Sequence, residues 1–233
     1  MATTFKQYSL PHEALRIGLL LAFVGGYLDA YTYLLRGQVF ANAQTGNIVL
    51  MGISVAQGHW DKVSFYVIPI VTFFLGILLT EYIKNKCDKS QLLNWEHMIF
   101  PIEIILLFGV GLYPVTAPNS IVNVVVSFVC AVQVQSFRVV HNTPYASTMC
   151  TGNLRSAAEN LFKLYKTKER VFLHKFLMYI FIIASFILGA GCGTFLSGIF
   201  FEKSIWVCCG VLLIAFLIII IRNRHIDNIE QEL

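Results

Sequence analysis

Asp29 is the residue whose position most strongly suggests chemistry, because this acid lies inside a long apolar segment, residues 14–35. If the segment crosses a bilayer, a charge there costs at least ~2.5–3.5 kcal/mol, so it usually faces a polar cavity or a partner. One interpretation is a carboxylate that couples proton or cation movement to that of a solute. The other is a structural carboxylate bonded to Tyr31, Tyr33 or an asparagine of the next loop. The sequence leaves both interpretations open.

Two polar clusters stand at the starts of short helix-forming segments and are candidates for binding a substrate or an ion. They consist of Asn42, Gln44, Thr45, Gly46 and Asn47, and of Thr148, Thr151, Gly152 and Asn153. Backbone N–H groups at a helix start are unpaired, and the positive end of the helix dipole attracts polar or anionic groups. Simple N-capping, by Thr45 or Asn47 in the first cluster, explains the same residues equally well.

Four further polar residues extend the list of candidates. Gln133 and Gln135 share one apolar segment, where substrate binding and hydrogen bonding across helices are equally good explanations. Glu103 lies inside another apolar segment and is a second candidate for a buried acid. His141 follows in a loop, and its ring titrates near neutral pH. Glu103 and His141 are therefore the weaker candidates, for a proton relay.

No motif points to a metal, a cofactor or a familiar enzyme mechanism. The six cysteines contain no C-x-x-C pair, and the chain has no G-x-x-x-x-G-K-[ST], G-x-S-x-G or H-E-x-x-H. We therefore expect no metal site, no cofactor and no enzymatic activity. The basic run 163–170 favours contact with anionic lipid over a nucleic-acid partner.

The elements that position these residues are predicted to cross a membrane. The chain is 57% hydrophobic and 13% charged, with a mean hydropathy of +0.69. Soluble domains average ~45–50% apolar and ~25% charged residues. A transmembrane helix needs ~20 mainly apolar residues. Six segments qualify: 14–35, 63–83, 97–115, 120–140, 172–200 and 204–221. The run 46–57 suits a re-entrant or interfacial helix better than a span, and 152–170 reads as an amphipathic surface helix.

The lysines and arginines predict which side of the membrane each loop faces. With six spans and both termini in the cytoplasm, 14 of these cations lie inside, and three, Arg36, Lys62 and Lys203, lie outside. Eight spans would give a weaker split of 10 to seven. Cytoplasmic loops carry the excess of positive charge, so the six-span arrangement is favoured.

The two halves of the chain repeat the same order of elements. Thr45-Gly46-Asn47 recurs 106 residues later as Thr151-Gly152-Asn153. Residues 14–115 and 120–221 each read as helix, Thr-Gly-Asn, short helix, long helix, helix. Because each half has three spans, the halves must lie in opposite orientations, as in many secondary transporters. A duplicated scaffold without transport is the alternative. Within the second half, the G-x-x-x-G of Gly189 and Gly193 predicts close helix packing.

Two motifs carry a resemblance to a known family. They are Gly26-Tyr27-Leu28-Asp29 and Gln44-Thr45-Gly46-Asn47, with Thr151-Gly152-Asn153 in the second half. The chain resembles, over nearly its whole length, the YoaK family of uncharacterised bacterial six-span membrane proteins, also described as domain of unknown function 1275. The resemblance implies the topology and supplies no substrate. Gln135 stands where the first half carries Asp29, so any site is asymmetric in charge.

We therefore expect a single all-α membrane domain over residues 1–233, with six spans as two inverted three-helix repeats, each with an extra short helix. The expected function is a small secondary transporter or permease of the bacterial plasma membrane, coupled to protons or cations, with an unknown small polar solute. The alternatives are a lipid-modifying enzyme and an accessory or structural subunit. The expected partners are the lipid bilayer, the solute and a second copy, since six spans are few for a transporter.

Overall fold

Long helices joined by short connections make up the computed structural model, which describes residues 11–87, 95–137, 139–140, 143–144 and 150–231. The elements are α1 (Pro11–Leu35), α2 (Gln44–Ala56), α3 (Trp60–Cys87), α4 (Trp95–Leu112), α5 (Asn119–Ser136), β1 (Val139–Val140), β2 (Thr143–Pro144), α6 (Cys150–Thr167), α7 (Arg170–Phe200), the 3-10 turn η1 (Phe201–Ile205) and α8 (Trp206–Gln231). β1 and β2 form one short antiparallel pair. The expected helical class is thus confirmed for the described part of the chain.

Most of the expected segments coincide with helices that are long and apolar enough to cross a membrane. These stretches are Leu15–Leu35, Trp60–Lys86, Asn119–Ser136 and Arg170–Ile221, the last of which contains α7, η1 and most of α8. Met98–Leu112 is apolar but shorter. The expected segment 120–140 extends too far, because α5 ends at Ser136 and β1 follows. β-branched valines such as Val139 and Val140 are as apolar as helix residues but favour extended backbone.

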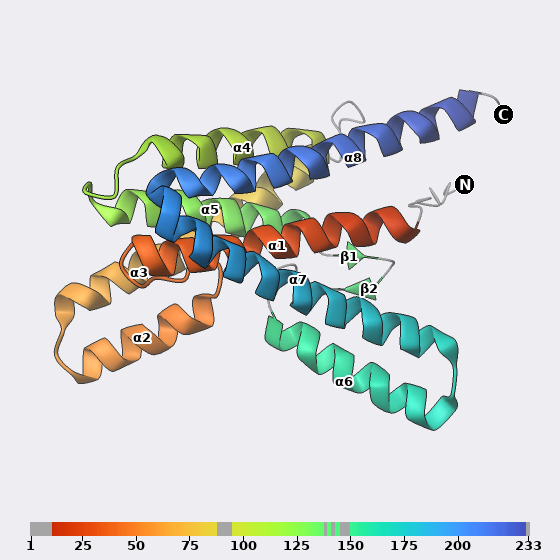
Figure 1. Cartoon of the computed structure of the whole chain (residues 1–233), viewed down its shortest axis with the longest axis horizontal. Helices are drawn as coiled ribbons and strands as arrows, with labels where there is room; N and C mark the ends of the chain where they lie inside the picture. The colour runs from red at the N-terminus through yellow and green to blue at the C-terminus, as the bar shows by residue number, and fades with distance from the viewer. Residues whose placement is uncertain (1–10, 88–94, 138, 141–142, 145–149, 232–233) are drawn as a thin grey trace.

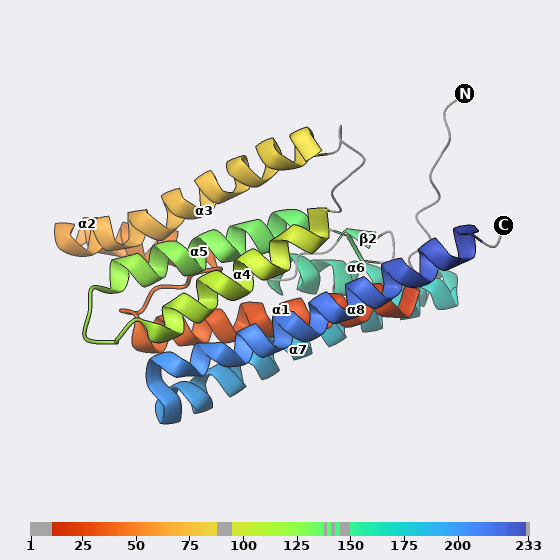
Figure 2. The ribbon, with the colours of Figure 1, turned by 90° about the horizontal axis from the view of Figure 1, so that it is seen from above.

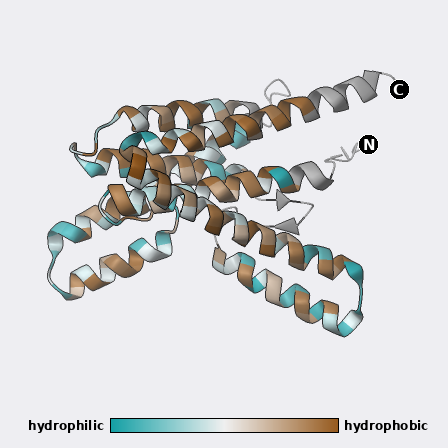
Figure 3. Cartoon of the chain, in the orientation of Figure 1, coloured by the Kyte–Doolittle hydropathy of each residue, from teal (hydrophilic) through white to brown (hydrophobic). Residues whose placement is uncertain are grey.

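The outward faces of the long helices are strongly apolar. Phe74 and Leu75 on α3, and Ile187 and Leu188 on α7, are each more than half exposed. Figure 3 shows hydrophobic residues, drawn in brown, along much of the length of these helices. A soluble monomer rarely exposes contiguous apolar surface on this scale. The surface therefore fits a lipid environment.

The helices pack around α1, which lies between α7 on one side and the pair α5 and α8 on the other (Figures 1 and 2). Leu21 and Leu28 of α1 are fully buried against a core that includes Phe100 of α4 and Leu212 of α8. α1 begins and α8 ends at the same end of the molecule (Figure 2). α2 and α6 start near the middle of the long axis and run toward opposite ends (Figure 1).

Small residues explain how closely α1 and α7 approach. A Cβ atom on Gly189 would collide with the backbone of Phe23, and one on Gly26 would collide with the backbone of Phe186. A Cβ on Gly193 would lie 2.9 Å from the carbonyl oxygen of Tyr27. Small residues at such crossings let helix backbones meet, so that dispersion contacts accumulate. The prediction that the G-x-x-x-G of α7 serves packing is confirmed.

Candidate functional site

Asp29 binds the backbone of the loop that leads from α1 into α2. Its Oδ1 accepts hydrogen bonds from the N–H groups of Asn42 (2.9 Å) and Ala43 (3.3 Å). One turn further along α1, the Thr32 hydroxyl oxygen accepts a hydrogen bond from the N–H of Ala41 at 3.2 Å. Non-helical backbone at membrane depth is tolerated only where its polar groups find partners. The structural interpretation expected a bond to an asparagine of this loop, and Asn42 makes it through its backbone N–H rather than its side chain.

The Thr-Gly-Asn motif of the first half fixes the same loop. The Asn47 side chain accepts a hydrogen bond from the N–H of Phe40 at 3.0 Å and donates one to the Phe40 carbonyl at 2.6 Å. Gly46 lies against the Phe40 ring, where a Cβ would come within 2.7 Å. Gln44 donates to the Ala41 carbonyl at 2.8 Å. The N-capping interpretation is wrong for this helix, because Ala43 occupies the cap position and no side chain bonds there.

Asn42 is the polar side chain that this arrangement leaves unused. It is only 4% exposed, and no described residue forms a hydrogen bond with its Oδ1 or its Nδ2. A buried group left unsatisfied costs about 1–3 kcal/mol. Such groups in native proteins need an explanation, and a ligand or bound water is a common one. Asn42 therefore marks a place beside Asp29 where a polar molecule would gain hydrogen bonds.

The second cluster begins within electrostatic reach of the same acid. Burial raises the pKa of the Cys150 thiol at the start of α6, and the negative charge of Asp29 raises it further. Asn153 is buried, whereas Thr151 and Gly152 are exposed. We call the site formed by Asp29, Asn42 and the first turns of α2 and α6 the junction. Thr148 and His141 lie outside the described residues.

Gln133 and Gln135 bond to other helices. The Gln133 amide donates to the Leu21 carbonyl of α1 at 3.1 Å, and the Gln135 amide donates to the carboxylate of Glu81 on α3. Both glutamines are buried. These contacts match the hypothesis of hydrogen bonding across helices.

Glu103 is a second buried acid, and within the part of the chain that the structure describes its carboxyl group has no hydrogen-bond partner. It is 1% exposed, and neither carboxyl oxygen accepts or donates a hydrogen bond. Cys130 of α5 lies within electrostatic reach of both Glu103 and Asp29. An isolated ionised carboxylate in such a place is very costly. Burial of Glu103 therefore lowers the stability of the fold, and no hydrogen bond to a described residue offsets that loss.

We expect Glu103→Leu to leave the stability unchanged or to raise it by about 1 kcal/mol, because replacing an unsatisfied polar group by an apolar one of similar shape is neutral or stabilising. Thermal unfolding of the purified chain in detergent measures this. Glu81→Leu is the matched control, and it should destabilise the chain because Gln135 loses its acceptor. A loss of stability in Glu103→Leu would mean that the acid has a partner in the membrane.

Arg36 is a buried cation that the sequence analysis placed in an external loop. It is fully buried, and it donates to the Tyr31 hydroxyl at 3.1 Å and to the carbonyls of Tyr113 (2.8 Å) and Pro114 (3.2 Å). Asn123 donates to the Arg36 carbonyl at 3.0 Å. Arg36 thus ties the end of α1 to the connection between α4 and α5. A cation at the end of an apolar segment gives no sequence signal for burial, because most such cations reach the headgroups.

Within the described residues, no three side chains of His, Cys, Asp or Glu gather closely enough to hold a metal ion. The chemistry available at the junction is hydrogen bonding by the Asn42 amide, the Asp29 carboxylate and helix starts. Such groups can bind a small polar molecule.

The comparisons with known proteins agree with this membrane architecture. The family model described as protein of unknown function (DUF1275) matches residues 17–218. The chain belongs to the DUF1275 family. A DUF1275 relative, the UPF0700 transmembrane protein YoaK of Bacillus subtilis (strain 168), is 23% identical over 193 residues, which cover 81% of this chain and 86% of the relative. No solved structure matches. The expected resemblance is confirmed, and the chain is a multi-pass membrane protein.

Proposed function

We propose that the chain is a small secondary transporter or permease of the bacterial plasma membrane, and that its solute binds at the junction. The observation that carries the proposal is the buried amide of Asn42, which no described residue satisfies and which lies beside Asp29 just before α2. The start of α6 lies within electrostatic reach of the same acid. In many transporters, interrupted helices aim their N-termini at a solute near the middle of the bilayer.

The pattern of helix contacts supports an inverted repeat of residues 14–115 and 120–221. If the halves are equivalent, each helix of the first half has a counterpart in the second: α5 for α1, α6 for α2, α7 for α3 and α8 for α4. The packed pair α1–α7 then corresponds to α5–α3, and the pair α2–α3 corresponds to α6–α7. Likewise α1–α8 corresponds to α5–α4, and the pairs α4–α8 and α1–α5 correspond to themselves. Each of these pairs is a packed pair in the fold. This is the set of packed pairs that two equivalent halves would give.

The placement of the connections supports the proposed orientation, with both termini in the cytoplasm. α6 ends and α7 begins at the end of the molecule where α1 starts, and α3 runs toward that end (Figures 1 and 2). The sequence around those points carries most of the cations, including Lys84, Lys86 and the run 163–170. The opposite end carries the few that remain. This asymmetry is what the positive-inside rule predicts for six spans.

The charge of the junction limits the kind of solute. Each helix N-terminus carries the equivalent of roughly +0.5 elementary charge. α2 begins next to the loop that Asp29 binds, and α6 begins within electrostatic reach of the same carboxylate. The two partial charges nearly cancel the acid. We therefore expect a small polar solute without net charge, bound through hydrogen bonds. Glu103, which is not engaged with other groups, is the better candidate for exchanging a proton or cation during transport.

The pairing of Asp29 favours the alternative, a membrane protein that does not transport. An acid whose oxygen already accepts two backbone N–H groups can be purely structural. An accessory subunit would keep the junction sealed, and a lipid-modifying enzyme would expose it to headgroups. Access of water to the junction therefore discriminates among the three functions.

Thiol labelling tests the proposal. The native cysteines are replaced, and single cysteines are introduced as Thr45→Cys and Thr151→Cys, both exposed positions at the helix starts. A transporter should allow a membrane-impermeant reagent to label the first from outside the cell and the second from inside. Ile187→Cys, on the apolar outer face of α7, is the control and should not react. Protection of both junction cysteines from both sides would support the accessory function instead.

A further inference from the structure

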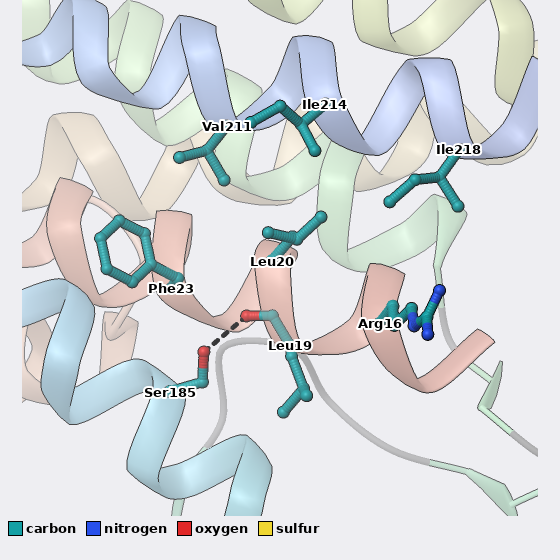
Figure 4. Close-up of a pocket in the computed structure, with 8 residues that line it drawn as sticks. All are labelled: Arg16, Leu19, Leu20, Phe23, Ser185, Val211, Ile214 and Ile218. Atoms are coloured by element: carbon teal, nitrogen blue, oxygen red, sulfur yellow. Dashed lines mark hydrogen bonds between the residues drawn. The ribbon is translucent and has the colours of Figure 1, made fainter. Parts of the chain in front are cut away.

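An apolar groove lies on the membrane-facing side of the bundle, between α1, α7 and α8. It has a volume of about 460 Å³, within the roughly 300–1,000 Å³ typical of small-molecule sites. Leu20 and Phe23 of α1 face Val211 and Ile214 of α8 across it (Figure 4). The groove is separate from the junction.

The two polar residues of the groove have different roles. Ser185 of α7 donates its hydroxyl to the Leu19 carbonyl at 2.7 Å, so it is already satisfied. Arg16 lies at the end of the groove near Ile218 (Figure 4), and its side chain is exposed. Among the described residues, no acid and no carbonyl binds its guanidinium group. The groove thus combines a long apolar wall with one free cation at its end.

The dimensions match one lipid chain within one leaflet. The apolar stretch of α1 begins at Leu15, which places Arg16 at the level of the headgroups. From Arg16 to Phe23 the helix rises about 10 Å, at ~1.5 Å per residue, and half of the hydrocarbon core is about 15 Å thick. A phosphate bound to Arg16 would therefore leave its acyl chain beside Leu20 and Phe23. Guanidinium groups bind phosphate through charge-assisted hydrogen bonds.

We propose that this groove is a binding site for an anionic phospholipid, with the phosphate on Arg16 and one acyl chain along α1 and α8. The site does not depend on transport. An apolar chain suits the groove better than a water-soluble ligand, because among the described residues only Arg16 and the satisfied Ser185 bring polar side chains to its wall. Lipid binding here would hold α8 against α1 and α7.

Native mass spectrometry of the full chain, with phosphatidylglycerol or phosphatidylcholine added to the detergent, tests the site. Arg16→Gln should lower the affinity for phosphatidylglycerol about tenfold and leave that for phosphatidylcholine unchanged. Lys62→Gln, an exposed cation on α3, is the matched control and should bind both lipids as the original does. Equal retention of phosphatidylglycerol by the two variants would overturn the proposal.

A second pair of variants tests the apolar part of the groove. Val211→Trp fills the space and should reduce the binding of both lipids severalfold, whereas Ile187→Trp, outside the groove, should not. Unchanged melting temperatures of the lipid-free variants show that folding is intact. Should Val211→Trp instead dissociate a dimer without changing the lipid count, the occupant would be a second copy of the chain, and the lipid site would be wrong.

Discussion

Replacing Asp29 by leucine is expected to destabilise the chain by about 2–4 kcal/mol, because the buried N–H of Asn42 and the part-buried N–H of Ala43 lose their acceptor. Each unsatisfied group of this kind costs about 1–3 kcal/mol, and removal of a buried acid returns part of the loss. Thermal unfolding in detergent, followed by tryptophan fluorescence or circular dichroism, measures the difference. The loop between α1 and α2 should also become more accessible to proteases.

Asp29→Asn is the control that separates structure from charge. Its Oδ1 can still accept the two hydrogen bonds, so we expect a loss of only about 1 kcal/mol, since neutral acceptors are weaker than charged ones. If transport by this variant keeps its pH dependence, Asp29 is not the coupling group, and attention moves to Glu103. A leucine variant as stable as the original chain would show that the hydrogen bonds from Asn42 and Ala43 to Asp29 contribute nothing to stability.

Gly189→Leu is expected to be the most disruptive substitution, with a loss of about 3 kcal/mol or more, at the top of the range for overpacked sites. A Cβ at this position already meets the backbone of Phe23, which cannot move aside as a side chain could. The larger side chain must separate α1 from α7 and thereby disturb Asp29, which lies further along α1. The measurements are the yield of monodisperse protein and its melting temperature.

Gly191→Leu is the matched control on the same helix. Nothing lies within 4 Å of a Cβ added there, and the residue is exposed. Because glycine is about 1 kcal/mol worse than ordinary residues inside a helix, this variant should be as stable as the original or slightly more stable. Equal damage from both substitutions would mean that helix propensity or insertion, rather than the crossing of α1 and α7, controls the stability.

The polar residues at and near the site form two groups, according to how far along the sequence their hydrogen-bond partners lie. Asn47 and Gln44 bind residues three to seven positions away, and the sequence singled them out as a cluster, although it suggested capping. Arg36 acts through carbonyl groups 77 and 78 residues away. No pattern near Arg36 reports such a contact, and the residue was assigned to an outer loop.

The helical class, the membrane environment and the approximate bounds of the apolar helices follow from the amino-acid sequence alone. These depend on the transfer of each segment from water to lipid, and that free energy is nearly a sum over its own residues. The sequence also indicates that Gly189 and Gly193 serve packing, since a small-residue spacing makes a flat helix surface whatever the partner.

Which polar groups in the membrane find hydrogen-bond partners depends on how the helices pack. Asp29 accepts hydrogen bonds, whereas the side chains of Asn42 and Glu103 form none with described residues. In the sequence all three are simply polar residues in or near apolar segments. Hydrogen bonds depend on distance and direction between groups that meet only when helices pack. The junction and its unused amide therefore follow from how α1, α2 and α6 come together.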